Sequence, residues 1–166
     1  MFEYGKTLAQ IHMIDKGFTE VKHRKFFDIP SVDYLKDNEI DFIYDYLQKN
    51  IPTETNKCFC HGDFHYANIL WKKKKLVAVL DWELSGIGNK EFDIAWAIIN
   101  RPSQKFLKTQ AEVNKFIEGY QSLNSCNVEY VKYYMILIYS HFISVDKNNK
   151  EYQDFVRNIL KQKTDR

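Results

Sequence analysis

Apolar residues recur with the period of an α-helix along most of the chain. Between residues 38 and 49, Ile40, Ile43, Tyr44 and Leu47 follow the i, i+3, i+4, i+7 spacing of one helix face. Similar patterns predict further helices, one of which is expected to end before Pro102. These helices are expected over residues 2–14, 90–100, 111–123, 128–144 and 151–161.

A pattern that favours β-strands occupies the middle of the chain. Residues 57–60 form a short apolar run, and residues 68–71 and 76–80 form two more on either side of Lys72–Lys75. We expect the last two runs to pair as a hairpin with a solvated, lysine-rich tip. The fold class is therefore predicted to be α+β and mainly helical, in a single domain.

The composition fits one packed domain without a strongly charged surface. The 166 residues are 45% hydrophobic and include 24 basic and 22 acidic side chains, a net charge of +2. A chain of this size buries about 70% of its unfolded surface. The near balance of charge gives no argument for a nucleic-acid partner, and no apolar stretch is long enough to predict a membrane span.

The three cysteines do not form an obvious metal or disulfide motif. Cys58 and Cys60 alternate on the predicted strand and so share one face, whereas Cys126 lies far away in the sequence. A second cysteine pair or paired histidines are missing from the sequence pattern. We therefore expect reduced thiols in a cytoplasmic protein, rather than zinc ligands or disulfides.

The polar residues with the clearest chemistry lie between residues 61 and 81. His61-Gly62-Asp63 begins a loop, Asn68 follows it, and Asp81 ends the second strand of the hairpin. A carboxylate such as Asp63 can orient a substrate hydroxyl and accept its proton, while an amide oxygen and a second carboxylate hold Mg²⁺ against ATP phosphates. The hairpin brings Asn68 and Asp81 to the same end, so the three side chains suit phosphoryl transfer.

This order of residues resembles the carboxyl-terminal lobe of the aminoglycoside phosphotransferase and choline kinase-like family. The resemblance covers residues 58–97, with His-Gly-Asp-x-x-x-x-Asn, a strand ending in Asp-Trp-Glu, and then Asp-Ile-Ala-Trp. Residues 5–12 are similar to the helix with which such lobes begin. The resemblance implies a protein-kinase-like fold whose hairpin carries the metal ligands, and transfer of the γ-phosphate of ATP or GTP to a hydroxyl of a small molecule.

Carried over residue by residue, the resemblance assigns five roles. Asp63 becomes the catalytic base, and Asn68 and Asp81 become the ligands of Mg²⁺. His61 is expected to fix the catalytic loop, and Asp93 to tie the following helix to that loop.

Other side chains are expected near the cleft. His65 and Glu83 are candidates for its rim. The family uses neighbouring segments as a wall for the acceptor, which here would include Phe26, Phe27, Tyr34, Tyr134 and His141. Aromatic residues at helical spacing are more often core than ligand wall, and His12 and His141 are better read as core histidines with satisfied nitrogens.

The sequence also lacks features that kinase-like enzymes need. We find no glycine-rich loop and no strand-borne lysine before the catalytic loop, so the chain reads as the carboxyl-terminal lobe alone. Within it we expect first helices over residues 1–57, a catalytic core over 58–101 and a helical subdomain over 102–166. The expected partners are a small-molecule hydroxyl acceptor, and either an amino-terminal lobe supplied in trans or a second copy of the chain.

Two functions other than phosphoryl transfer are possible interpretations of these residues. Asp63-x-His65 and the run Gly88-Asn89-Lys90-Glu91 superficially match ligands of dinuclear metallophosphoesterases, but Lys90 stands where a histidine is needed. The stronger alternative is a non-catalytic binding module, or an inactive remnant of such a kinase.

Overall fold

The computed structural model describes residues 1–15, 22–23, 27–53, 57–102 and 104–165. Its helices and 3-10 turns are α1 (Phe2–His12), α2 (Val32–Asp37), η1 (Asp41–Ile43), α3 (Tyr44–Lys49), η2 (Tyr66–Asn68), α4 (Lys90–Ile98), α5 (Gln110–Gln121), α6 (Val128–Phe142) and α7 (Lys150–Thr164). Its strands are β1 (Lys57–Cys60), β2 (Ile69–Lys72), β3 (Lys75–Val79) and β4 (Gly86–Asn89). The mainly helical α+β class is confirmed.

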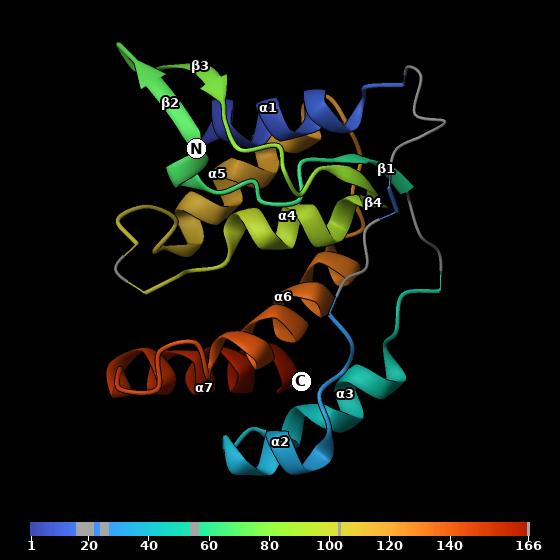
Figure 1. Ribbon diagram of the computed structural model, residues 1–166, viewed down its shortest axis with the longest axis vertical. Coiled ribbons are helices and arrows are strands. Elements are labelled where there is room, and N and C mark those ends of the chain that lie inside the picture. The colour runs from blue at the N-terminus through green and yellow to red at the C-terminus, as the bar shows by residue number, and fades with distance from the viewer. Residues whose placement is uncertain (16–21, 24–26, 54–56, 103, 166) are drawn as a thin grey trace.

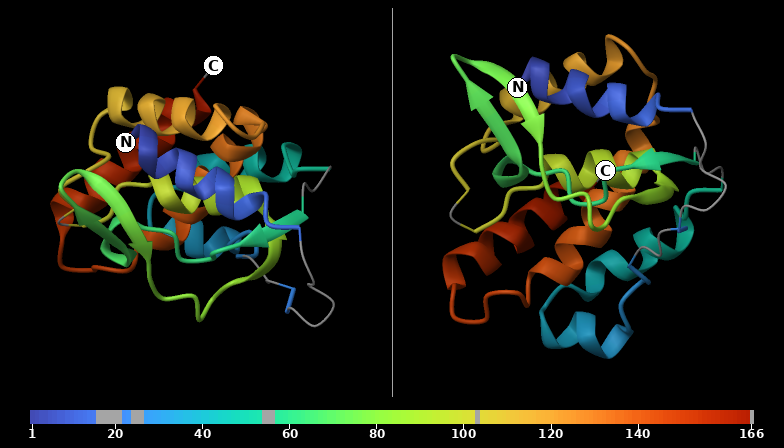
Figure 2. Two further views of the ribbon diagram at one scale, coloured as in Figure 1. Left: turned by 90° about the horizontal axis from the view of Figure 1, so that it is seen from above. Right: turned by 45° about the horizontal axis from the view of Figure 1, so that its top comes forward.

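The helices form two groups joined through α4 and α6 (Figure 1). One group contains α1, α4 and α5 together with all four strands, and the other contains α2, α3, α6 and α7. Helix α5 packs against α1, and α4 packs against α6, so a continuous apolar core runs through both groups. Each group therefore combines segments that are far apart in the sequence (Figure 2).

Two glycines allow α1 and α5 to cross closely. A Cβ atom on Gly5 would overlap the backbone carbonyl of Phe116, and a Cβ atom on Gly119 would overlap the backbone of Phe2. Only glycine permits this approach of the two backbones. Tyr4 of α1 donates a hydrogen bond to the carbonyl of Phe64 over 3.3 Å, so the crossing helps to position the predicted catalytic loop, residues 61–68.

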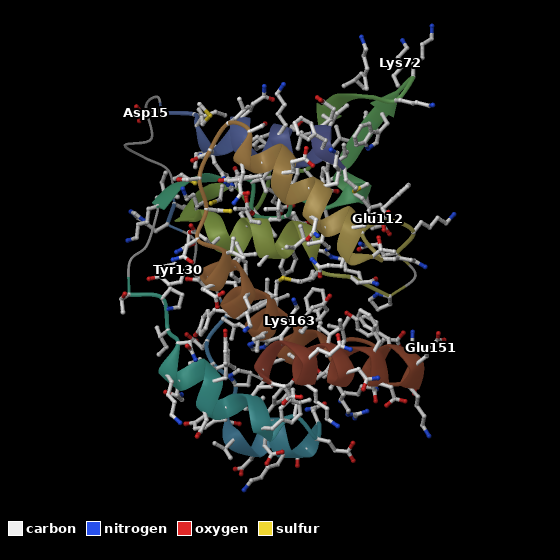
Figure 3. The ribbon with its side chains drawn as sticks, turned by 180° about the vertical axis from the view of Figure 1, so that it is seen from behind. Asp15, Lys72, Glu112, Tyr130, Glu151 and Lys163 are labelled. Atoms are coloured by element: carbon white, nitrogen blue, oxygen red, sulfur yellow. The ribbon has the colours of Figure 1, made fainter. Side chains whose placement is uncertain are left out.

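The predicted hairpin is present. Its strands have the expected lengths, but each lies one residue closer to the tip, which is therefore shorter than expected. Strand β2 pairs with β3 in antiparallel register from Ile69 opposite Val79 to Lys72 opposite Lys75, with an irregularity after Leu70. The tip consists of Lys73 and Lys74, which have φ angles of 48° and 64°. Two consecutive positive φ values are typical of the type I′ turn that suits a twisted hairpin. Lys72 extends from the outer end of the hairpin (Figure 3).

Strand β4 was not predicted from the sequence. It pairs in antiparallel register with the predicted strand β1, from Lys57 opposite Asn89 to Cys60 opposite Gly86. Its sequence, Gly-Ile-Gly-Asn, has too few β-favouring side chains to indicate a strand by itself. This small sheet fixes the chain on both sides of the hairpin.

The predicted helices are confirmed, with shifted ends. The segment predicted as one helix over residues 38–49 begins later, with the 3-10 turn η1 followed by α3, because Glu39 has a φ angle of 58°. Helix α2 precedes it and was missed. Its N-cap is Ser31, whose hydroxyl accepts a hydrogen bond from the backbone N–H of Tyr34. Among the described helices, none combines the length and apolarity needed to cross a membrane.

Candidate active site

The carboxylate of Asp93 holds the beginning of the catalytic loop. It comes from the second half of the first turn of α4 and is fully buried. Its Oδ2 accepts a hydrogen bond from the backbone N–H of His61, and its Oδ1 accepts one from Gly62, each over 2.9 Å. Gly62 has a φ angle of 86°, which a residue with a Cβ rarely adopts. Helix α4 is thereby joined to the turn that precedes Asp63.

The imidazole of His61 connects this loop to the end of β3. Its Nε2 donates to the carbonyl of Leu80 over 2.9 Å, and its Nδ1 accepts a hydrogen bond from the backbone N–H of Asp63 over 3.2 Å. Burial lowers the pKa of His61, against the opposing effect of nearby carboxylates. A neutral ring with its proton on Nε2 satisfies both contacts. It also lies against the indole of Trp82, with ring centroids 4.5 Å apart.

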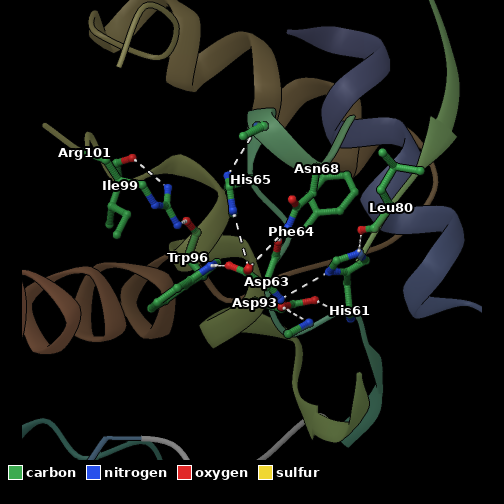
Figure 4. Close-up of polar contacts among 12 residues, drawn as sticks. His61, Asp63, Phe64, His65, Asn68, Leu80, Asp93, Trp96, Ile99 and Arg101 are labelled. Carbon is green, nitrogen blue, oxygen red and sulfur yellow. Dashed lines mark hydrogen bonds and ion pairs between the residues drawn. The ribbon is translucent and has the colours of Figure 1, made fainter. Parts of the chain in front are cut away.

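Three side chains contact the carboxylate of Asp63, one from α4 and two from the segment of η2 and its N-cap (Figure 4). Trp96 Nε1 donates to its Oδ1 over 2.8 Å, Asn68 Nδ2 donates to its Oδ2 over 3.2 Å, and His65 Nε2 lies 3.4 Å from the same oxygen. Partial burial would raise the pKa of Asp63. The hydrogen bonds from His65 and Trp96 and the charge of Arg101 outweigh it and leave that pKa below its usual value. Asp63 is therefore an oriented, ionised carboxylate that is still 21% exposed.

Asn68 and Asp81 lie at the same end of the hairpin, as predicted. The backbone N–H of Leu80 donates to the carbonyl of Asn68 over 2.8 Å, and Asp81 follows directly. The side-chain nitrogen of Asn68 also donates to the carbonyl of Asp63 over 3.0 Å, which leaves the amide oxygen available to other partners. Asp81 is exposed and has a φ angle of 60°, a conformation in which aspartate is enriched. Their role as metal ligands remains a prediction.

Two contributors to the site were missed in the sequence. Trp96 donates a hydrogen bond to Asp63, and Arg101 in turn holds Trp96 in place. Nη2 of Arg101 donates to the carbonyl of Trp96 over 2.7 Å, and the guanidinium of Arg101 lies 5.0 Å from the centre of the indole ring. Trp96 could have been found, because it follows Asp93 by one helical turn and so shares the face of α4 that meets the loop. Arg101 lies beyond the end of α4 and gave no such signal.

The other candidates are distributed more widely. Glu83 is exposed in the turn after Asp81. Phe26 lies outside the described residues. Phe27 contacts Phe92, Trp96 and His141, with ring centroids 5.9, 6.1 and 4.5 Å away. It therefore adjoins the indole that holds Asp63.

The remaining wall candidates differ from one another. Tyr134 is buried in the core. Tyr34 is half-buried and donates a hydrogen bond to the carbonyl of Ser140 over 3.1 Å. His141 is half-buried as well, and its Nε2 donates to the carbonyl of Asp28 over 2.9 Å, so the expectation of a core histidine is wrong there. The expectation of a core histidine is confirmed for His12, which is buried and has both ring nitrogens in hydrogen bonds.

A pocket of about 450 Å³ opens between the beginning of α1 and the hairpin. It is lined by Met1, Tyr4, Tyr66, Trp71, Lys74 and Phe106. Tyr66 is its contact with the catalytic loop. The lining is mostly apolar and contains no carboxylate. The pocket therefore lacks the polar groups that phosphoryl transfer needs, and these groups lie around Asp63 instead.

Residues 1–125 match the model of the phosphotransferase enzyme family. The chain belongs to this family. Curated relatives include the mouse acyl-CoA dehydrogenase family member 11, which is 41% identical over 94 residues, and a probable acyl-CoA dehydrogenase of Arabidopsis thaliana, 28% identical over 86 residues. These segments cover 55% and 48% of this chain, but only 11% and 10% of the relatives.

Solved structures of the same fold include antibiotic phosphotransferases. A spectinomycin phosphotransferase in complex with ADP and spectinomycin has a TM-score of 0.58 at 18% identity. An amicoumacin kinase in complex with AMP-PNP and Ca²⁺ has a TM-score of 0.59 at 12% identity. The two alignments cover 99% and 98% of this chain, but only 61% of the spectinomycin phosphotransferase and 60% of the amicoumacin kinase. The protein-kinase-like fold expected from the sequence is thereby confirmed.

Proposed function

We propose that this chain forms the catalytic part of a phosphotransferase that transfers the γ-phosphate of ATP or GTP to a hydroxyl group of a small molecule. The observation that carries this proposal is the arrangement of Asp63. Its carboxylate is held by Trp96, Asn68 and His65 and remains partly exposed. An ionised, oriented and accessible carboxylate is what the acceptor hydroxyl requires.

In this mechanism Asp63 mainly orients the acceptor. With its pKa below the usual range, Asp63 is ionised at neutral pH but is a weak base. Because the transition state of phosphoryl transfer is largely dissociative, the hydroxyl needs alignment early and loses its proton late. Trp96 and Asn68 fix the two carboxylate oxygens, so that Asp63 holds the attacking oxygen in line with the phosphate.

Asn68 and Asp81 are the proposed ligands of Mg²⁺. The amide nitrogen of Asn68 is occupied by Asp63, which directs the amide oxygen away from that contact. Asp81 is exposed and directly follows Leu80, whose backbone N–H bonds to the carbonyl of Asn68. An all-oxygen donor set of this kind fits Mg²⁺ better than a soft metal. When bound, Mg²⁺ would neutralise charge on the β- and γ-phosphates.

The phosphate donor is proposed by analogy with the solved neighbours, and the acceptor is proposed only as a class, the hydroxylated small molecules. The two solved neighbours described above are complexes with ADP and AMP-PNP, which supports a nucleotide donor. Their acceptors are spectinomycin and amicoumacin, whereas the curated relatives carry the name of acyl-CoA dehydrogenases. A panel of acceptors should therefore include hydroxylated antibiotics and hydroxylated acyl-CoA thioesters.

A further surface is proposed for a second lobe or a second copy. Large apolar side chains are exposed along the hairpin and the segment after it: Leu70, Trp71, Val77, Leu80, Trp82 and Leu84. Apolar patches of this kind usually mark a contact surface. The chain by itself supplies the metal side of the nucleotide site.

Calorimetry with Mg-ATP and Mg-GTP tests this proposal on the chain as given. We expect a dissociation constant on the order of millimolar, equivalent to about 4 kcal/mol, because phosphate charge not met by this chain remains in water. Micromolar binding accompanied by turnover would contradict an incomplete nucleotide site. If acceptors from the panel bind but no nucleotide does, the chain is a binding module instead.

A further inference from the structure

Two cysteines and a histidine converge behind the catalytic loop. His12 ends α1, and Cys58 and Cys60 lie on one face of β1. One ligand atom from each of the three residues lies within 4.8 Å of the other two. His12 and Cys60 are buried and Cys58 is half-buried. The fold brings His12 to β1, although 45 residues of sequence separate His12 from Cys58, so zinc ligands were not expected here.

The hydrogen bonds of His12 orient its ring for a metal. Its Nε2 lies 3.1 Å from Oδ2 of Asp93, which only accepts hydrogen bonds as a carboxylate, so this nitrogen carries a proton. In the neutral ring, Nδ1 then has the lone pair, and the hydroxyl of Tyr120 approaches that nitrogen to 2.8 Å. Metal-binding histidines usually donate their other N–H to a carboxylate in this way.

The two sulfur atoms have the spacing of a shared zinc ion. Cys58 Sγ and Cys60 Sγ are 3.8 Å apart, too far for a disulfide. Two thiolates bound to one tetrahedral zinc at about 2.3 Å each would be about 3.8 Å apart. We propose that Cys58, Cys60 and His12 Nδ1 bind Zn²⁺, with the fourth position facing the Tyr120 hydroxyl.

Such a site would stabilise the catalytic loop from behind. Cys60 directly precedes His61, and Asp93 contacts both His12 and the backbone of His61. A bound ion would join α1 to β1 at this point. It would therefore act as a structural metal, separate from the all-oxygen site proposed at Asn68 and Asp81.

Cobalt and zinc titrations under reducing conditions test the site without any need for activity. Co²⁺ should bind in a 1:1 ratio and give the thiolate charge-transfer and tetrahedral d–d absorption bands, and Zn²⁺ should displace it. Cys58→Ser should weaken Zn²⁺ binding by more than about 100-fold, since loss of an outer-shell partner alone costs about 10–100-fold. Cys126→Ser is the matched control and should leave binding unchanged.

X-ray absorption of the zinc-loaded wild-type chain provides the second measurement, which needs no variant to fold. Two sulfur neighbours and at least one imidazole should surround the metal. Zn²⁺ should also raise the melting temperature of the wild type but not that of Cys58→Ser. A stoichiometry other than 1:1, a sulfur-free metal environment, or equal affinity in wild type and Cys58→Ser would overturn the proposal.

Discussion

The indole N–H of Trp96 donates a 2.8 Å hydrogen bond to Oδ1 of Asp63, which joins helix α4 to the catalytic loop. Asp93, one turn earlier on α4, holds the backbone of the same loop. One helix face therefore fixes both the path of the loop and the direction of its carboxylate.

Trp96→Phe should raise the pKa of Asp63. The substitution removes a hydrogen bond that stabilises the ionised carboxylate, while the partial burial that disfavours the charge remains. NMR titration of the Asp63 carboxyl group measures this shift. Trp82→Phe is the matched control, because Trp82 donates to the carbonyl of Val79 instead. Equal Asp63 titrations in all three proteins would show that the Trp96 contact has no electrostatic effect.

Asp63→Asn should abolish most phosphoryl transfer in an active enzyme that contains this chain. We expect kcat to fall by about 10²–10⁴-fold, the usual contribution of a general acid–base group. The fold should persist, since Asn has nearly the same shape and Asp63 is partly exposed. Steady-state kinetics with circular dichroism as the folding control provides the measurement. Unchanged kcat would remove Asp63 from the mechanism.

Stability should fall as the pH decreases below 6.5, in part through His61. Its pKa in the folded protein lies below 6.5, so the unfolded chain binds more protons in the interval between the two pKa values. The contribution is complete above pH 6.5 and is lost as the pH falls through the folded pKa. Denaturant unfolding should show a smaller pH slope for His61→Gln than for the wild type. Parallel curves below pH 6.5 would be inconsistent with a neutral, buried His61.

Gly119→Ala should destabilise the protein despite the higher helix propensity of alanine. The added Cβ would overlap the backbone of Phe2 and force α1 and α5 apart, at a cost of about 1–3 kcal/mol. Asn114→Ala is the control, because Asn114 lies on the exposed side of α5 and also gains helix propensity, while losing only an exposed hydrogen bond from Gln110. Urea unfolding of both variants distinguishes the crossing from propensity. A stabilised Gly119→Ala would contradict the close approach.

The fold was predictable wherever local sequence determines local structure. Helical periodicity located α1 and α4 to α7, and β-favouring runs located the hairpin. Strand β4 was not predictable, because its glycine-rich sequence becomes a strand only by pairing with β1. Likewise α2 is too short for a periodic pattern and depends on its Ser31 cap.

In the candidate site, too, local sequence predicts some features and tertiary packing determines the others. The contact between Asp63 and Asn68 and the position of Asp81 at the same end of the hairpin were predictable, because a loop and a hairpin keep these residues close in sequence. The support from Arg101 and the approach of His12 to Cys58 arise from helix packing, which no short motif records. Sequence patterns therefore indicated the candidate polar groups better than the residues that hold them.

Paramagnetic broadening by Mn²⁺-ATP tests the proposed phosphotransferase site most directly. Mn²⁺ shares the preference of Mg²⁺ for oxygen ligands, and millimolar nucleotide suffices even for weak binding. In the NMR spectrum of the chain, the side-chain amide of Asn68 and the backbone signals of Asp63 and Asp81 should broaden first, and Asp81→Asn should abolish the effect. Broadening centred elsewhere, or equal broadening in Asp81→Asn, would contradict a metal–nucleotide site at these residues.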